Sequence, residues 1–245
     1  MPDLLALVLA ATVTMVATGV GALPVIWLGD RAERLRGALW GVAAGTMAVA
    51  SVTGLLLPAM DSGAPGAVTG GLVAGGVFVF AARVFVNVEE RRRGAGASAR
   101  DAVLVFAVLF VHSLPEGLAI GTAWASTTAG LSTFVVAAIA VQNVPEGTAT
   151  AIPMRLAGAG PARLFWGATL TSLPQPVGAV VAYLAVEQVE SLLPFSFAFA
   201  AGAMLVLVII ELIPKAWSEQ PRWSGAAGAG AGAVAMLALG AVLGV

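Results

Sequence analysis

Apolar segments long enough to cross a lipid bilayer follow one another along the whole of this 245-residue chain. A membrane-spanning helix needs roughly 20 apolar residues. Eight such segments can be marked: 4–28, 38–60, 66–88, 102–124, 130–153, 164–186, 192–214 and 225–245. Charged residues make up only 10% of the chain and the mean hydropathy is +0.96, so much of the surface must face something other than water. Because lipid cannot hydrogen-bond a free backbone, the sequence predicts an all-α integral membrane protein with eight transmembrane helices.

The chain is expected to form a single transmembrane domain over residues 1–245. The loops between the apolar segments are short, and no stretch has the composition of a separate soluble domain. The first apolar run follows Met1-Pro2-Asp3 without the basic region of a signal peptide, and is interpreted as a retained span. The chain has no cysteine, which excludes disulfides, thiolate metal sites and cysteine nucleophiles.

The basic residues are confined to alternate loops. All twelve lie in or beside the first, third, fifth and seventh loops: Arg31, Arg34, Arg36, Arg83, Arg91, Arg92, Arg93, Arg100, Arg155, Arg163, Lys215 and Arg222. Cytoplasmic loops of membrane proteins are enriched in Lys and Arg. The pattern therefore predicts an even number of spans, with both termini on the outer side of the cell (inner or plasma) membrane.

A few ionisable side chains lie inside the apolar segments, where they cost several kcal/mol and usually face a polar pathway. They are His112 and Glu116 in the fourth segment, Glu146 in the fifth and Glu211 in the seventh. The fourth and fifth segments carry related strings, His112-Ser113-Leu114-Pro115-Glu116-Gly117 and Gln142-Asn143-Val144-Pro145-Glu146-Gly147. In each string a polar side chain precedes a glutamate by four positions, which puts both on one helix face.

The prolines of these strings predict a kink in each helix. Pro115 cannot donate to the carbonyl of Val111, and Pro145 cannot donate to that of Val141. Broken helices of this kind form midplane ion sites in transporters, and the glycine after each glutamate lets neighbouring backbone or ions approach. Imidazole and carboxylate groups are good ligands for zinc and its first-row neighbours, and two glutamates would neutralise one divalent cation.

At these motifs the chain resembles the ZIP (Zrt- and Irt-like) family of metal transporters. That family has eight spans, outward termini, and H-[NS]-x-P-E-G and [HQ]-[ND]-x-P-E-G motifs in the fourth and fifth spans. Glu211-Leu212-Ile213-Pro214 and Pro174-Gln175-Pro176-Val177-Gly178 resemble further family elements. The resemblance implies a main metal site of His112, Glu116, Gln142 and Glu146, a candidate second site at Ser113 and Asn143, and a place for Glu211 on the exit route.

The resemblance also implies net movement of a divalent metal into the cytosol and a homodimer as a candidate assembly. Zn²⁺ is the expected ion, and Cd²⁺, Fe²⁺, Mn²⁺ and Co²⁺ fit the same ligands. No prosthetic group and no nucleic-acid partner are expected; the partners are the metal ion and the lipid bilayer. Gln175 stands where many members have a bridging glutamate, which predicts a single central metal with Ser113, Asn143 and Gln175 as a weak neighbouring site. The histidines usual in the third loop are absent from residues 89–101.

Other classes of protein account for fewer of these features. A metal-dependent hydrolase of the H-E-x-x-H type needs a second histidine, and the chain has one. A purely structural membrane protein would not require carboxylates at matching depths. A proton- or sodium-coupled carrier of another small solute is the alternative, because buried glutamates also relay protons.

Overall fold

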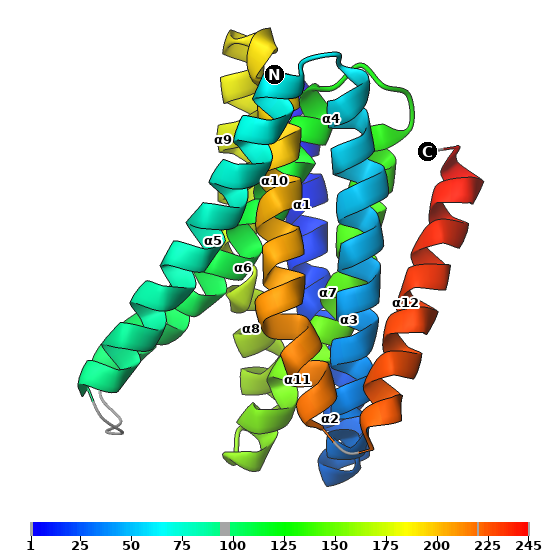
Figure 1. The fold of residues 1–245 in the computed structure, drawn as a ribbon. Helices are drawn as coiled ribbons and strands as arrows, with labels where there is room; N and C mark the ends of the chain where they lie inside the picture. The colour runs from blue at the N-terminus through cyan, green and yellow to red at the C-terminus, as the bar shows by residue number, and fades with distance from the viewer. Residues whose placement is uncertain (1, 94–98, 220, 245) are drawn as a thin grey trace.

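The structure is a computed structural model in which the chain forms one bundle of helices (Figure 1). It describes residues 2–93, 99–219 and 221–244, and within these ranges all side chains except those of 2, 30, 86, 87 and 89–111. The described part of the chain is helical apart from short turns and contains no strand. The predicted all-α fold is therefore confirmed.

The helices follow the predicted apolar segments closely. In chain order they are α1 (Pro2–Val20), α2 (Leu23–Leu28), η1 (Gly29–Leu35), α3 (Arg36–Ser51), η2 (Val52–Leu56), α4 (Leu57–Asp61), α5 (Pro65–Arg93), α6 (Ala99–Ala125), α7 (Leu131–Leu156), α8 (Pro161–Thr171), α9 (Pro174–Gln188), η3 (Glu190–Leu192), α10 (Leu193–Leu207), η4 (Val208–Leu212), α11 (Ile213–Ser218) and α12 (Arg222–Leu243). Several of these elements run on from one another, so that the number of rods is smaller than the number of labels (Figure 1).

Six stretches are long and apolar enough to cross a membrane within the described residues. They are Asp3–Leu28, Arg31–Asp61, Pro65–Phe85, Pro161–Gln188, Glu190–Ser218 and Arg222–Leu243. The other two predicted spans, 102–124 and 130–153, coincide with α6 and α7, which are 27 and 26 residues long. The two helices that carry the paired motifs are thus as long as the spans around them, and their membrane crossing stays a prediction.

Prolines and π-helical turns interrupt the rods at corresponding places. The rod α3–η2–α4 contains a π-helical turn at Val52–Leu56, and the rod α10–η4–α11 contains one at Val208–Leu212. In each case a proline, Pro58 or Pro214, follows two residues after the turn. A proline has no N–H and its ring crowds the preceding helical turn, and a π-helical turn is one way for a helix to absorb such a defect.

Small residues bring pairs of helices into backbone contact. A Cβ atom added to Gly41 or Gly45 of α3 would collide with the backbone of Gly225 or Ala229 in α12. The same holds for Gly75 of α5 against the backbone of α10. Close packing of this kind is typical of membrane helices, which cannot use the hydrophobic effect against each other. Gly225, Gly228 and Gly232 of α12 likewise lie against the backbone of α11 or α3 and serve helix packing.

Replacing Gly228 by Ala is expected to lower the thermal unfolding temperature of the detergent-solubilised protein. The new methyl group would collide with the carbonyl oxygen of Ala38 and push α12 away from α3, and overpacking of this kind costs about 1–3 kcal/mol. Gly230→Ala is the matched control on the same helix, because a Cβ atom there meets nothing within 4 Å. Equal losses of stability in the two variants would contradict this packing.

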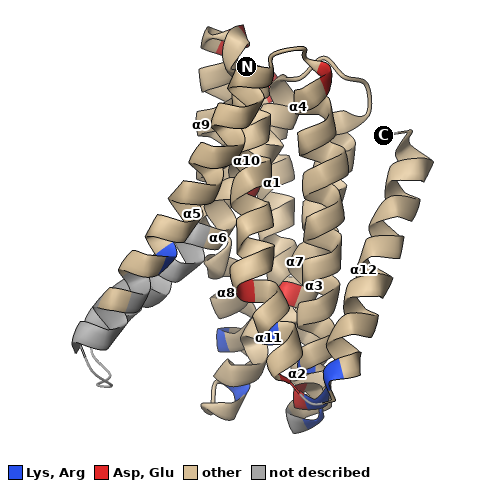
Figure 2. Cartoon of the chain, viewed as in Figure 1, with Lys and Arg blue, Asp and Glu red and all other residues tan. Residues whose placement is uncertain are grey.

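The two ends of the bundle differ in charge (Figure 2). Both termini lie at one end, together with the acidic end of α4, and the basic residues of η1, α8 and α12 lie at the other. The side chains of Arg91, Arg92, Arg93 and Arg100 are outside the described part of the chain. The segregation is the one that the alternate basic loops predict, and it supports a cytoplasmic location for the basic end.

Exposed tryptophans gather at the basic end as well. Trp27 of α2, Trp166 of α8, Trp217 of α11 and Trp223 of α12 all lie close to the basic residues in the sequence and are largely exposed. Tryptophan is enriched where a membrane meets water, because its ring is apolar and its N–H can bond to headgroups. We therefore take this level of the bundle as one membrane–water interface.

Single cysteines can test the orientation, because the chain has no native cysteine. Ser62→Cys, in the exposed turn beside the termini, is expected to react from outside the cell with an impermeant thiol reagent. Ala157→Cys, exposed at the basic end of α7, should react only after the membrane is opened. Labelling of Ala157→Cys in intact cells would overturn the proposed orientation.

Candidate metal-binding site

The helices α6 and α7 lie side by side in the bundle and run on through their central prolines. Pro115 lies inside α6 and Pro145 inside α7, and both helices continue for a further two turns or more. Each proline lacks the N–H that would bond to the preceding turn. Both motifs are nevertheless helical, so that polar residues four positions apart lie on one helix face.

The glycine of each motif is a point of close helix approach. A Cβ atom on Gly117 of α6 would collide with the backbone of Gln175 in α9, and one on Gly147 of α7 would collide with the carbonyl of Thr18 in α1. The prediction that these glycines admit neighbouring backbone is confirmed. As a result α9 and α1 bring their own polar side chains up to the two motifs.

Glu116 lies at the centre of a hydrogen-bonded group of neutral amides. Glu116 is only 1% exposed to solvent. Oε1 accepts a hydrogen bond of 2.7 Å from Nε2 of Gln142 in α7, and Oε2 accepts one of 2.5 Å from Nε2 of Gln175 in α9. Two of the predicted main-site residues, Glu116 and Gln142, are thus in direct contact across the α6–α7 pair.

The predicted second-site residues are hydrogen-bonded to protein groups. Gln175 accepts hydrogen bonds at Oε1 from Oγ1 of Thr14, at 2.8 Å, and from Nδ2 of Asn143, at 3.2 Å. The same Nδ2 donates to the carbonyl oxygen of Thr14 at 2.7 Å. Ser113 donates to the carbonyl oxygen of Thr171 at 3.0 Å. Gln175 therefore joins α1, α6, α7 and α9 through a single side chain.

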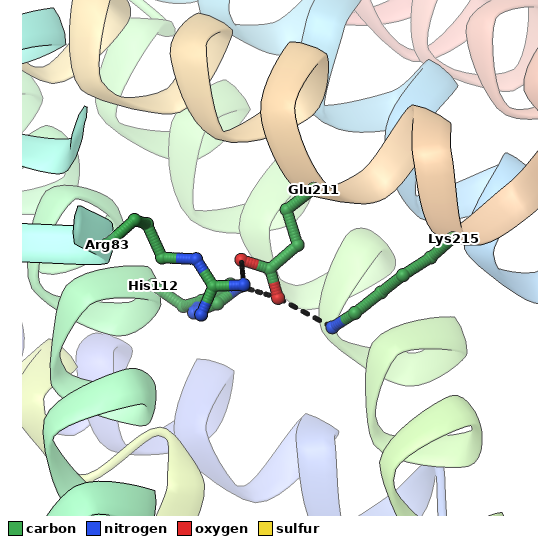
Figure 3. Close-up of polar contacts among 4 residues, drawn as sticks. All are labelled: Arg83, His112, Glu211 and Lys215. Carbon is green, nitrogen blue, oxygen red and sulfur yellow. Dashed lines mark hydrogen bonds and ion pairs between the residues drawn. The ribbon is translucent and has the colours of Figure 1, made fainter. Parts of the chain in front are cut away.

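His112 is turned toward Glu211 (Figure 3). Its Nε2 lies 3.0 Å from Oε1 of Glu211. The same oxygen is 2.5 Å from Nζ of Lys215, and Oε2 is 2.8 Å from a guanidinium nitrogen of Arg83. The buried carboxylate of η4 is thus surrounded by nitrogen-bearing side chains from α5, α6 and α11.

Glu146 and Gln142 each present an oxygen that the surrounding protein leaves without a donor. Within the described side chains, Glu146 makes no hydrogen bond, although it interacts electrostatically with His112 and Lys215. Oε1 of Gln142 is buried and has no hydrogen-bond partner there either. Across the part of the chain whose side chains are placed, no three His, Cys, Asp or Glu residues gather as a preformed metal site. The structure thus joins Glu116 to Gln142 and His112 to Glu211, and a metal site of all four predicted residues stays a prediction.

The sequence did not reveal the cations around Glu211. The loop pattern predicts only a topological role for Arg83 and Lys215, whereas the structure pairs both with the same carboxylate. For Lys215 a signal was present, because it follows Glu211 by four positions on one helix face. For Arg83 and for Thr14, which lie far from their partners along the chain, no local pattern indicates the contact.

Membrane-length helices that bury carboxylates between them are typical of proteins that move ions across a bilayer. Residues 87–244 match the family described as ZIP zinc transporter. Because this match covers more than half of the chain, the chain belongs to that family. Membership makes it a transporter and not an enzyme, as the sequence predicted.

Individual relatives are similar over most of this chain. Zinc transporter GufA of Myxococcus xanthus is 33% identical over 212 residues, which are 81% of this chain and 84% of that protein. Zinc transporter ZIPB of Bordetella bronchiseptica is 32% identical over 252 residues, which cover 97% of this chain and 81% of that protein. A relative from Arabidopsis thaliana, also named as a zinc transporter, is 34% identical over 83% of this chain, but the match spans only 33% of that longer protein.

Proposed function

We propose that this chain carries a divalent metal ion, Zn²⁺ in the first place, across the cell membrane into the cytosol. The ion would bind between α6 and α7, with His112, Glu116, Gln142 and Glu146 as its ligands. The observation that carries the proposal is a pair of carboxylates, the buried Glu116 and the partly buried Glu146, with no ion pair to an Arg or Lys side chain among the described residues. Glu116 receives hydrogen bonds from neutral amides only, and Glu146 receives none among the described side chains.

Charge balance explains why a divalent ion suits this place. Removing an ionised carboxylate from water is costly unless an opposite charge is close by. Glu116 and Glu146 together carry two negative charges when ionised, and one divalent cation compensates both. The unpaired Oε1 of Gln142 adds a neutral oxygen ligand beside Glu116. Carboxylate, amide and imidazole groups are all suitable ligands for Zn²⁺ and its first-row neighbours.

His112 would complete the site by leaving Glu211. It lies on the same face of α6 as Glu116, one helical turn away, and it interacts electrostatically with both Glu116 and Glu146. In this proposal, a change of the His112 rotamer moves its imidazole ring from Glu211 in η4 to the metal bound between Glu116 and Glu146. In this proposal the contact with Glu211 belongs to the metal-free protein, and Glu211 lies on the route by which the ion leaves.

The choice of zinc rests on the relatives. GufA of Myxococcus xanthus and ZIPB of Bordetella bronchiseptica are both named as zinc transporters. The nitrogen and oxygen ligands alone would also accept Cd²⁺, Fe²⁺, Mn²⁺ or Co²⁺. We place the protein in the plasma membrane with its basic end in the cytosol, and take a homodimer as the candidate assembly.

Zinc uptake into proteoliposomes that contain a zinc-sensitive dye tests the proposal. Glu116→Gln and Glu146→Gln are each expected to reduce uptake to the background of protein-free vesicles, because one carboxylate leaves a divalent ion undercompensated in a medium of low dielectric constant. Glu190→Gln, at an exposed position in η3, removes the same charge and should leave uptake unchanged.

Two results would refute the site or the function. Full zinc uptake by the Glu116→Gln, Glu146→Gln double variant would show that the ion does not bind between these carboxylates. The absence of a zinc signal with the unmodified protein would instead favour a carrier of another solute that relays protons through the same glutamates.

The structure gives the single-metal proposal a physical basis at Gln175. Its amide N–H already occupies Oε2 of Glu116, and its oxygen is shared by Thr14 and Asn143. A neutral amide brings no charge to hold a second divalent ion, and such an ion would leave about two uncompensated positive charges in the low-dielectric centre. We therefore propose one tightly held metal per chain, with Ser113, Asn143 and Gln175 as at most a weak neighbouring site.

Replacing Gln175 by Glu is expected to raise the amount of zinc bound per chain from about one toward two. The variant loses the N–H donated to Glu116 and gains a negative charge beside it. The measurement is equilibrium dialysis of purified protein with metal analysis. Gln188→Glu, an exposed position at the end of α9, is the control for added charge and should bind as the unmodified protein does. Two tightly bound zinc ions in the unmodified protein would contradict the argument.

A further inference from the structure

Glu211 is held more firmly than either central carboxylate. Its side chain is 2% exposed and lies in the π-helical turn η4, between α5, α6 and α11 (Figure 3). Arg83 reaches one of its oxygens, and His112 and Lys215 share the other. Any ion that left the centre by way of this carboxylate would have to replace at least one of these partners.

Lys215 is the partner best placed to leave. Its side chain is 41% exposed, whereas that of Arg83 is 20% and that of His112 is 8% exposed. Nζ of Lys215 also lies 4.4 Å from the centroid of the Trp40 ring, which attracts a cation. The long lysine side chain can therefore move toward water at the basic end while its stem stays against the protein.

The charge of Lys215 also reaches the central site. Glu146 interacts favourably with Lys215 and unfavourably with Glu211. With the histidine neutral, Glu116, Glu146 and Glu211 outnumber the cations Arg83 and Lys215 by one charge. A divalent ion would reverse the sign of this group, and movement of Lys215 into water would bring it to neutrality. Binding of the ion and release of Lys215 therefore favour each other in a medium of low dielectric constant.

We propose that Lys215 is a tethered counter-cation that competes with the transported metal for Glu211. In the empty protein the ammonium group contacts both Glu211 and the Trp40 ring, and when a metal arrives it is displaced from Glu211 toward water along the Trp40 face. Its return to Glu211 then helps to expel the metal into the cytosol. This inference rests on the proposed function, because it concerns the exit of the same ion.

The test is the zinc concentration dependence of uptake into proteoliposomes by Lys215→Met. Without the competing ammonium group the metal should stay longer at Glu211, so that release slows. The maximal rate and the half-saturating zinc concentration should both fall by roughly fivefold, the size of effect expected for a part-exposed ion pair. Their ratio should change little, because access from the outside is untouched. A merely damaged protein would lose maximal rate without binding zinc more tightly.

Matched variants separate this effect from a general loss of positive charge. Lys215→Arg keeps a cation near Glu211 and is expected to restore most of the unmodified values. Arg222→Met removes one charge from the same end of the bundle, at an exposed position, and should change neither parameter. In a Glu211→Gln background the effect of Lys215→Met should disappear, because the site of competition is gone.

The inference is overturned if Lys215→Met leaves both parameters unchanged, if its half-saturating concentration rises, if Arg222→Met gives the same change, or if the effect persists with Glu211→Gln. Each of these results presupposes zinc uptake by the unmodified protein. An unmodified protein that does not transport zinc would refute the proposed function itself, and the two failures are therefore distinguishable.

Discussion

Burial of carboxylates away from water is the constraint on which the centre of this protein depends. An ionised carboxylate in a medium of low dielectric constant needs hydrogen-bond donors and an opposite charge nearby. The chain meets this need differently at each glutamate. Glu211 is paired with the side-chain cations of Arg83 and Lys215, Glu116 has amide donors, and Glu146 has no donor among the described side chains. The need for charge is therefore greatest between α6 and α7, where a transported cation would meet it.

The paired motifs serve packing as well as chemistry. Because Gly117 lets the backbone of α9 approach α6, Gln175 can reach Glu116. Gly147 does the same for α1 and α7, next to the point where Asn143 bonds to the backbone of Thr14. A larger residue at either glycine would move a polar side chain away from the site. The four helices around the centre thus depend on close backbone contact for the position of their hydrogen bonds.

Local patterns predicted the helical fold, because apolar length predicted the rods. The four-residue spacing placed His112 with Glu116 and Gln142 with Glu146, each pair on one helix face. The structure adds a hydrogen bond between Glu116 and Gln142, and the metal site itself stays a prediction. The sequence could not predict that His112 faces Glu211, or that Arg83 pairs with it, because both contacts join helices far apart along the chain. For α7, apolar length is a weaker guide, since the polar residues Gln142, Asn143 and Glu146 interrupt its apolar run.

The order of helices before α6–α7 resembles the order after it, but the two π-helical turns differ in charge. On each side a broken rod is followed by a rod with a π-helical turn and then by a straight helix, and α3 packs on α12 as α5 packs on α10. The two rods with π-helical turns run in opposite directions, so that η2 lies nearer the end with the termini and η4 nearer the basic end (Figure 1). Three residues before the proline, η2 carries Leu55 and η4 carries Glu211. Among the described residues, two rods of similar build therefore differ in charge, because the π-helical turn nearer the basic end carries the carboxylate of Glu211 and the other carries apolar side chains and Thr53. In the proposed mechanism, this asymmetry distinguishes the side on which the ion is released from the side on which it binds.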